Sequence, residues 1–247
     1  MIVDSENDIK YLKTIGHICA MTLKEMMEQV KPGMTTGELD NIGREFLEKE
    51  GAQSAPMAIY QFPGATCISI SPVIAHGIPG DHVLREGELI NIDVSARLNG
   101  YFGDTGASMV VAKHVPEFEK MIEANKSALE NAVQIARAGQ KINMIGKTIQ
   151  QEAKRNGYGV IYDLTGHGIG RHLHEEPAQV FNYFKSKDRH ILEEGLVLAI
   201  EPFLTTGKGH VLEEEDGWSL RTTDRTIATQ FEHTIIVTKG EPIILTI

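Results

Sequence analysis

The dipeptide Asn99-Gly100 constrains this chain more than any other feature, because it sets the register of a long β-hairpin. Asn-Gly is the strongest short-range signal for a two-residue hairpin turn, since both residues tolerate positive φ. Facing residues then have numbers that sum to 199, so Asp104 lies opposite Ser95. Side chains alternate between the two faces of a strand, so Asp93 shares a face with Ser95. The sequence therefore predicts two diagonal aspartates on one face of the hairpin.

Two carboxylates this close together among apolar residues need a counter-charge. Diagonal neighbours on a sheet have Cβ atoms roughly 7 Å apart, a gap that two divalent ions about 3.5–4 Å apart can fill. Asp93 lies between Ile92 and Val94, and an unpaired charge in such surroundings is costly. A structural alternative stays open here, because aspartates near the ends of strands are usually turn or capping residues.

Composition places the chain among ordinary globular proteins and excludes several classes. With 247 residues it can form one large domain or two small ones. The net charge of −10 argues against DNA binding and against anionic membrane surfaces. No run of about 18 apolar residues exists, and the first residues lack a signal-peptide pattern. Cys19 and Cys67 show neither disulfide-framework nor zinc spacing, so we expect reduced thiols in a cytoplasmic protein.

Hydrophobic periodicity and capping residues predict four helices, with strands and loops elsewhere. The segment 52–80 is predicted as loops and short strands, and the part after Asn156 as mostly strand and loop. The predicted helices span residues 6–30, a second from a cap at Thr35 or Thr36 to about Lys49, then 117–137 and 142–156.

The chain also shows signs of an internal duplication. Segments 33–51 and 139–157 have the same Gly-to-Gly spacing, and each frames a predicted helix. A His-Gly-Ile segment follows in both halves, at His76 and at His167, and then a Glu-Gly strand that ends in an acid, Asp93 or Glu201. Chance similarity among short strands is the alternative. We predict a single domain, 1–247, with pseudo-two-fold halves at about 1–115 and 116–247.

Three further side chains join the aspartates as candidate metal ligands. His167 lies between glycines, Glu201 ends an apolar strand before a proline, and Glu232 precedes another apolar strand. Four carboxylates and one imidazole suit Mn, Fe, Co or Zn, whereas the absence of thiolates argues against a structural zinc site. Four negative charges can share one apolar cleft only with about two divalent cations.

Seven motifs occur in order along essentially the whole chain: AHGIPGD, NIDV, GYFGDT, TGHGIGRHLHEEP, LAIEPF, DGW and FEHTIIV. With them the chain resembles the methionine aminopeptidases of the short, type I bacterial kind. The resemblance implies an α+β pita-bread (creatinase/aminopeptidase-like) fold, in which two helix pairs flank a curved antiparallel sheet. It also implies two divalent ions (Co, Mn, Fe or Zn) bound by five ligands: Asp93, Asp104, His167, Glu201 and Glu232.

The activity that the resemblance implies is removal of the initiator methionine when the second residue is small. A metal-bridging hydroxide would attack the scissile amide. Glu201 would take a proton from the water and return it to the leaving amine. His174 would hydrogen-bond the scissile carbonyl oxygen, and His76 would steady the reacting amide.

The residues of the family's methionine pocket match this sequence less completely than its metal ligands do. Phe62, Cys67 and Trp218 match family positions in the pocket wall, and His76 and His174 also contact substrate in the family. A flexible thioether suits such an apolar, aromatic slot. Further wall positions where relatives often hold other residues are Pro56, Ile59 and Leu173.

The resemblance also suggests binding partners and leaves two alternative functions open. The expected partners are N-terminal methionyl peptides and nascent chains, with the ribosome as a further candidate, and we expect a monomer. Ser71-Pro72 stands where relatives often have Asn and an acidic residue. In the family this loop is associated with a monovalent cation, so whether this chain keeps that cation site stays open.

An Xaa-Pro aminopeptidase or dipeptidase of the same fold is the main alternative function, although those enzymes usually carry an additional N-terminal domain. A non-catalytic peptide-binding module is the third possibility, although such relatives typically lose metal ligands.

Overall fold

Four α-helices, one π-helix and fifteen strands make up this chain, and the computed structural model describes all residues 1–247. None of the helices combines the length and the apolar character that crossing a membrane would require. The helices are α1 Glu6–Gln29, α2 Thr36–Lys49, the π-helix η1 Pro56–Tyr60, α3 Pro116–Ile135 and α4 Asn143–Arg155. The strands are β1 Gln53–Ser54, β2 Cys67–Ile70, β3 Val73–Ala75, β4 Leu89–Leu98, β5 Tyr101–Val110, β6 Gly159–Val160, β7 Thr165–Gly168, β8 Glu175–Phe181, β9 Val197–Ile200, β10 Phe203–Thr205, β11 Val211–Glu213, β12 Leu220–Thr222, β13 Ala228–Gln230, β14 His233–Ile236 and β15 Ile243–Ile244.

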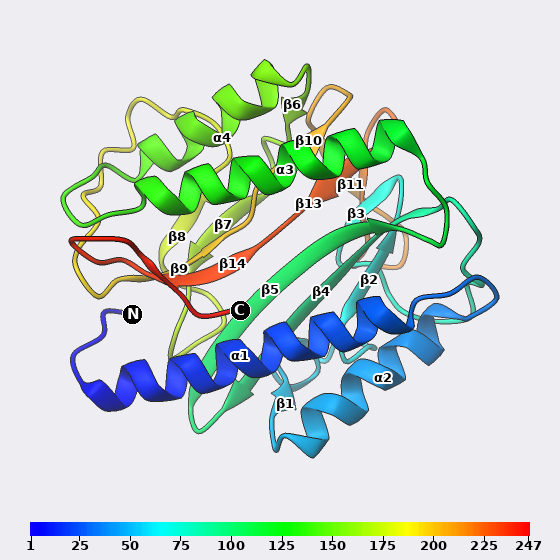
Figure 1. The fold of residues 1–247 in the computed structure, drawn as a ribbon, viewed down its shortest axis with the longest axis horizontal. Coiled ribbons are helices and arrows are strands. Elements are labelled where there is room, and N and C mark those ends of the chain that lie inside the picture. Colours follow the sequence, from blue (N-terminus) through cyan, green and yellow to red (C-terminus); the bar gives the residue numbers. More distant parts are fainter.

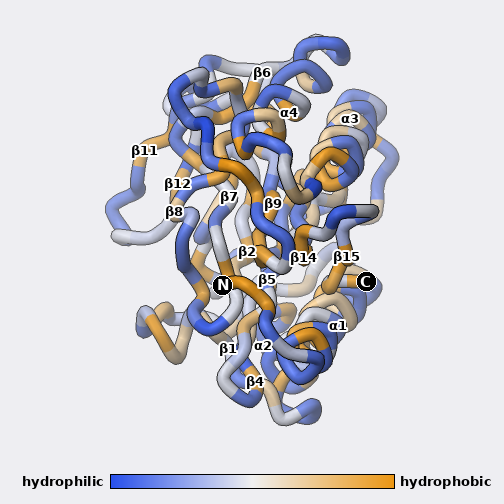
Figure 2. The backbone as a smooth tube through the Cα atoms, turned by 90° about the vertical axis from the view of Figure 1, so that its left-hand side faces the viewer, coloured by the Kyte–Doolittle hydropathy of each residue, from blue (hydrophilic) through white to orange (hydrophobic).

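Two antiparallel sheets form the centre of the molecule. In the first, β4 pairs with β1, β2 and β5, and in the second the order is β15-β14-β9-β7-β8. In Figure 1 the pair α3/α4 lies above the central strands and the pair α1/α2 below them. Seen from the side, α1 and α3 lie on one side of the strands, and β8, β11 and β12 lie on the other (Figure 2). This arrangement is the pita-bread fold that the sequence motifs imply.

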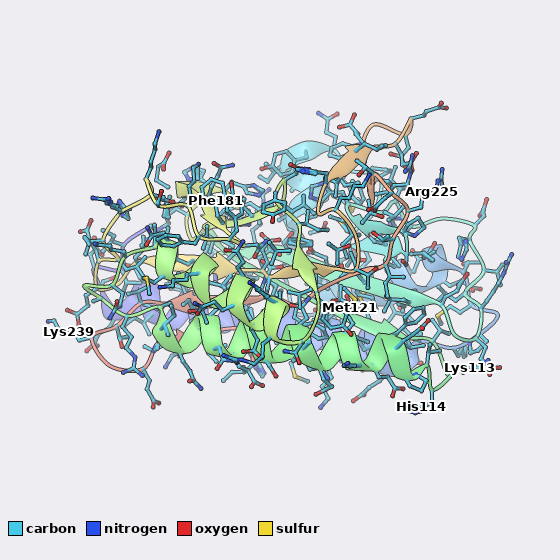
Figure 3. All side chains as sticks on the ribbon, turned by 90° about the horizontal axis from the view of Figure 1, so that it is seen from above. Lys113, His114, Met121, Phe181, Arg225 and Lys239 are labelled. Carbon is cyan, nitrogen blue, oxygen red and sulfur yellow. The ribbon has the colours of Figure 1, made fainter.

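Figure 3 shows the side chains of the molecule seen from above. Met121 of α3 is fully buried against the strands. Lys113 and Lys239 extend outward at opposite ends of the molecule. Apolar side chains thus pack between helices and sheet, while charged side chains cover the rim.

The hairpin β4–β5 has the predicted register. Ser95 faces Asp104, and Leu98 faces Tyr101 across the turn. Asn99 and Gly100 both have positive φ, 53° and 80°, as a type I′ turn requires. The prediction from the dipeptide is therefore confirmed.

Capping residues determine where the first two helices begin. Thr35 caps α2: its Oγ1 accepts from the backbone N–H of Glu38 (3.1 Å), and the Glu38 carboxylate accepts from the Thr35 N–H (2.8 Å). Ser5 and Asp8 form the same reciprocal pair at the start of α1. The helices α3 and α4 begin and end within two residues of the predicted bounds. The first residue of α3 is Pro116, and proline is favoured in a first helical turn.

Equivalent backbone hydrogen bonds recur in the two halves. Gly33 donates to Leu84 O, and Gly139 donates to Leu192 O, both at 2.9 Å. The same two glycines have φ of 88° and 89°. Isolated bridges repeat likewise, between residues 35 and 83 and between residues 141 and 191. This repetition confirms the internal similarity that the glycine spacing predicts.

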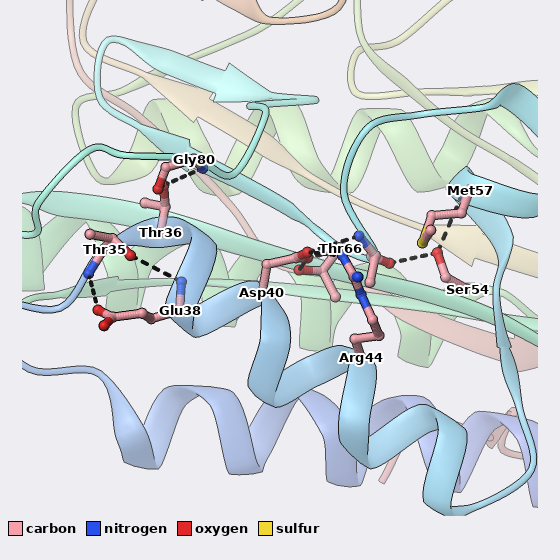
Figure 4. A network of polar contacts seen from close by, with 10 residues as sticks. Thr35, Thr36, Glu38, Asp40, Arg44, Ser54, Met57, Thr66 and Gly80 are labelled. Atoms are coloured by element: carbon pink, nitrogen blue, oxygen red, sulfur yellow. Dashed lines mark hydrogen bonds and ion pairs between the residues drawn. The ribbon is translucent and has the colours of Figure 1, made fainter.

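A buried carboxylate of α2 holds the loop that leads into β2 (Figure 4). Asp40 accepts hydrogen bonds from the N–H and the hydroxyl of Thr66, both at 2.8 Å, and from the N–H of Ala65 at 3.1 Å. Arg44 on the next turn forms an ion pair with the same side chain at 3.3 Å. The start of β2 at Cys67 is therefore attached firmly to α2.

Candidate metal centre

A cavity of about 290 Å³ lies where the two central sheets meet. Residues from both halves of the chain line it, and they fall into a polar group and an apolar group. The polar group contains all five predicted ligands. The lining residues are Pro56, Tyr60, Phe62, Cys67, His76, Asp93, Ser95, Asp104, His167, Leu173, His174, Glu201, Trp218 and Glu232.

His167, on β7, is positioned as a neutral candidate ligand. Its Nδ1 lies 3.0 Å from the carbonyl oxygen of Gly168, which places the proton on Nδ1 and leaves the Nε2 lone pair free. Burial lowers the pKa of this imidazole to about 4, so the ring is neutral at neutral pH. Nε2 lies 3.8 Å from Asp104 Oδ2 and 3.7 Å from Glu201 Oε1.

The carboxylates surround that nitrogen. Asp104, His167 and Glu232 each offer a ligand atom, and these atoms lie within 4.8 Å of one another. Asp104 Oδ1 and Glu232 Oε1 are buried and have no hydrogen-bond partner, which is costly unless a cation is present. Asp93 lies beside Asp104 at the same cavity.

Cross-strand hydrogen bonds hold two of these candidate ligands from the side away from the cavity. Thr234 of β14 accepts from the Asp104 N–H at 3.0 Å and donates to the Asp104 carbonyl oxygen at 2.7 Å. The Gln230 amide donates to Glu232 Oε2 at 3.0 Å, and Asn91 donates to the Gln230 side chain at 2.8 Å. Glu232 therefore keeps one oxygen hydrogen-bonded and presents the other to the cavity.

The crowding of acids raises their pKa values. Burial raises the pKa of Asp93 to about 7. Burial first, and neighbouring carboxylates second, raise the pKa values of Asp104, Glu201 and Glu232 well above the ordinary range. A donor set of four such oxygen ligands and one free imidazole nitrogen fits divalent ions of the Mn-to-Zn series.

These shifts predict how pH changes the stability of the metal-free protein. Between about pH 7.5 and 8.5 the histidines of an unfolded chain, with an ordinary pKa of about 6.5, have lost their protons. The buried carboxyl groups with raised pKa values still hold protons that the unfolded chain releases. Stability of the metal-free protein therefore falls as pH rises through this window, by up to about 1.4 kcal/mol per pH unit for each proton held. Divalent ions bound to these carboxylates would replace those protons.

Thermal unfolding at pH 7.5, 8 and 8.5 checks this prediction. The difference in Tm between protein loaded with Mn²⁺ and protein treated with chelator should widen as pH rises. Mg²⁺ at the same concentration serves as an ionic-strength control. If this difference in Tm narrowed as pH rises, the raised pKa values of the clustered carboxyl groups would be contradicted.

Two further histidines and a tyrosine face the ligands across the cavity. The His174 ring lies 4.2 Å from the His167 ring, centroid to centroid, and its Nδ1 lies 2.7 Å from the Tyr60 hydroxyl. His76 follows β3 with a φ of 54°, an uncommon conformation for a non-glycine residue. Desolvation lowers the pKa values of His76 and His174, so both can act as neutral hydrogen-bonding groups.

An apolar slot adjoins the ligands. Phe62 and Trp218 meet edge to face with centroids 5.2 Å apart, and Cys67 and Leu173 are buried beside the same cavity. Cys67 faces Asp93 across β2 and β4. The slot is thus in direct contact with the carboxylate cluster.

The structure places Ile59 outside the cavity, contrary to the sequence prediction, and places Tyr60 in its wall. Ile59 is 42 % exposed and lines a separate shallow pocket. The reason is η1: a π-helix has hydrogen bonds between residues five apart and hence a wide turn. Tyr60, not Ile59, therefore shares the cavity-facing side with Pro56. The apolar sequence of η1, PMAIY, contains no residue type that indicates a π-helix, so the sequence did not predict this turn.

Comparison with known proteins assigns these features to a family. The model of metallopeptidase family M24 matches residues 10–239. A methionine aminopeptidase of Staphylococcus epidermidis is 47 % identical over 247 residues, which is 100 % of this chain and 98 % of that protein. The crystal structure of methionine aminopeptidase from Rickettsia prowazekii is 35 % identical, with a TM-score of 0.95 and full coverage of both chains. A prolidase from Pyrococcus furiosus, 22 % identical, shares the fold with a TM-score of 0.79, and this chain covers 65 % of it.

Proposed function

This chain belongs to metallopeptidase family M24, and from that premise we infer that its cavity cleaves the bond that follows an N-terminal methionine. It is a metal-dependent hydrolase with methionine aminopeptidase activity, as its full-length similarity to enzymes of that name supports. The observation that carries the assignment to this cavity is the meeting of five predicted ligands beside an apolar slot.

The proposed ligands are Asp93 and Asp104 from the hairpin, and His167, Glu201 and Glu232 from the second half. We propose that they hold two ions drawn from Co, Mn, Fe and Zn, because four acids need about two divalent charges. Such ions, when bound, supply Lewis acidity and lower the pKa of a water molecule to about 7.

Glu201 is the proposed proton carrier. It follows β9 and lines the cavity, where a carboxylate can take a proton from a water molecule and release it again. The water oxygen forms a bond to the scissile carbonyl carbon and gives its proton to Glu201. The carbon–nitrogen bond then breaks, and Glu201 delivers the proton to the leaving amine.

The histidines are proposed to bind the reacting amide. His174, neutral at pH 7, donates a hydrogen bond to the carbonyl oxygen as negative charge develops there. His76, held by its left-handed backbone at the cavity, orients the amide. Both act without a net charge of their own.

Substrate selection is proposed to depend on the slot of Phe62, Cys67, Leu173 and Trp218. Its walls are apolar and partly aromatic, and a methionine side chain is flexible, unbranched and polarisable enough to fill such a space. Nascent chains that begin with methionine are the proposed cellular substrates.

Peptide cleavage tests this function against its rival. Metal-loaded protein should release methionine from Met-Ala-Ser, chelator should abolish the release, and Mn²⁺ or Co²⁺ should restore it. An Xaa-Pro dipeptide and a proline-containing tripeptide serve as matched substrates, and we expect at least about 100-fold lower kcat/KM for them. Faster cleavage of the Xaa-Pro substrates would favour the prolidase assignment, and no cleavage of any substrate would favour a binding module.

We propose further that residues 1–247 form one catalytic domain that works in the cytoplasm. One cluster of 50 buried apolar residues includes members of all four α-helices, which supports a single domain. Both cysteines are buried free thiols, which is usual for a reducing compartment. A monomeric state, contact with the ribosome and a monovalent cation beside Ser71-Pro72 stay predictions.

A further inference from the structure

Tyr60 and His174 form a hydrogen bond that spans the cavity. The Tyr60 hydroxyl lies 2.7 Å from His174 Nδ1, and the two ring centroids are 5.9 Å apart at an interplanar angle of 52°. Tyr60 ends η1 in the first half, and His174 precedes β8 in the second half. This contact therefore joins the two halves directly beside the proposed reacting atoms.

The chemistry of the two groups favours the phenol as the donor. A phenol keeps its proton at neutral pH, and burial raises the pKa of Tyr60 above its ordinary value, so its hydroxyl is a good donor. A neutral imidazole has one N–H and one lone pair. If Tyr60 donates to Nδ1, the imidazole proton must lie on Nε2, and Nε2–H is the only polar group that His174 can still offer.

The ring of His174 is also held on its flat side. The His167 ring lies 4.2 Å from it, so the Tyr60 hydroxyl fixes one edge while His167 limits rotation of the ring. Tyr60 itself is 44 % exposed, and no other polar partner of its hydroxyl is present. A half-exposed tyrosine with a single short hydrogen bond to a cavity histidine is poorly explained by packing alone.

We propose that Tyr60 is a positioning residue, which holds His174 in the tautomer and orientation that present Nε2–H to the substrate carbonyl. This proposal rests on the proposed function, because it concerns the group that donates to the carbonyl oxygen. Without the phenol, His174 can rotate or place its proton on Nδ1, and then an acceptor faces the developing negative charge. The loss falls mainly on the transition state, so kcat should change and KM should change little.

Tyr60→Phe tests the proposal, because it removes only the hydroxyl from an exposed side chain. We expect kcat for Met-Ala-Ser to fall by about 10-fold, with KM within about two-fold. Met57→Leu, on the same π-helix but outside the cavity, is the matched control and should keep full activity. In a His174→Ala background the Tyr60→Phe change should have almost no further effect.

Nitrogen-15 NMR of the zinc-loaded protein, which is diamagnetic, gives a readout independent of turnover. His174 should show an unprotonated Nδ1 and a protonated Nε2, and this pattern should be lost or averaged in Tyr60→Phe. A protonated Nδ1 in the wild-type protein would overturn the proposal, as would an equal loss of kcat with and without His174. If the protein cleaves no peptide, the proposed function fails, and the NMR pattern still decides the role of Tyr60.

Discussion

Glu201→Gln lowers kcat/KM for Met-Ala-Ser by about 10⁴-fold while the protein stays folded. Glutamine has the size and shape of glutamate but can neither accept a proton nor supply a negative charge. General base catalysis alone contributes about 10²–10⁴-fold, and a lost anionic ligand adds to the effect. The measurement is steady-state hydrolysis at saturating Mn²⁺, with metal content determined on the same sample.

Glu194→Gln is the matched control for this change. Glu194 lies just before β9, on the same segment as Glu201, but it is exposed and forms only a surface ion pair with Lys239. Surface pairs contribute about 0–1 kcal/mol, so activity should stay within about two-fold of the wild-type value. If Glu201→Gln retained a tenth of the wild-type kcat/KM, Glu201 could not be the proton carrier.

Asp104→Asn should act in opposite directions on stability and on activity. Asp104 is buried, one of its oxygens has no partner, and burial with neighbouring acids raises its pKa. The metal-free wild-type protein must therefore keep a proton there or bury a charge, and asparagine avoids both costs. We expect metal-free Asp104→Asn to be more stable by about 2 kcal/mol at pH 7.5, or roughly 4–8 °C in Tm.

The same substitution removes a ligand, so metal affinity and activity fall together. Replacing an anionic ligand by a neutral amide should weaken binding of the ion by at least about 100-fold and lower kcat/KM by about 10³-fold. Calorimetric titration with Mn²⁺ and unfolding of the chelated protein measure the two effects. Asp188→Asn, on a loop remote from the cavity, should change neither quantity.

The two results together discriminate between a functional and a structural role for the acid cluster. A structural Asp104 would lose stability on substitution, because its hydrogen bonds would be broken. A chelated Asp104→Asn protein that unfolds at a lower temperature than the chelated wild type would therefore contradict the metal-site account. Natural active sites often retain such a cost in stability.

Local signals in the sequence determined much of this protein. Asn99-Gly100 specified the hairpin register because a type I′ turn needs two residues with positive φ. Thr35 and Glu38 specified the start of α2 because they satisfy free N–H groups within one turn. Each of these signals acts over a few residues, so it can be interpreted without knowledge of the rest of the fold.

The sequence also predicted the proposed ligands, although it did not show how they come together in space. Motifs indicated Asp93, Asp104, His167, Glu201 and Glu232 as residues of one kind of site. Only the folded chain brings His167 Nε2 to within 3.8 Å of Asp104 and 3.7 Å of Glu201, because β7 must pair with β9, and β5 must bridge to Phe231 in the other half. Cross-strand contacts between β5 and the segment before β14 do this, and no local rule predicts them.

Tertiary structure decided which side chain of η1 faces the cavity. Sequence matching named Ile59, whereas the π-helix turns Ile59 outward and Tyr60 inward. Gln61, with φ of 58°, ends that helix in a left-handed conformation. Propensity differences in so short a segment are small compared with the packing that surrounds it, so side-chain direction there is set by neighbours distant in sequence. The contact between Tyr60 and His174 exists for the same reason, because it needs both halves of the chain in place.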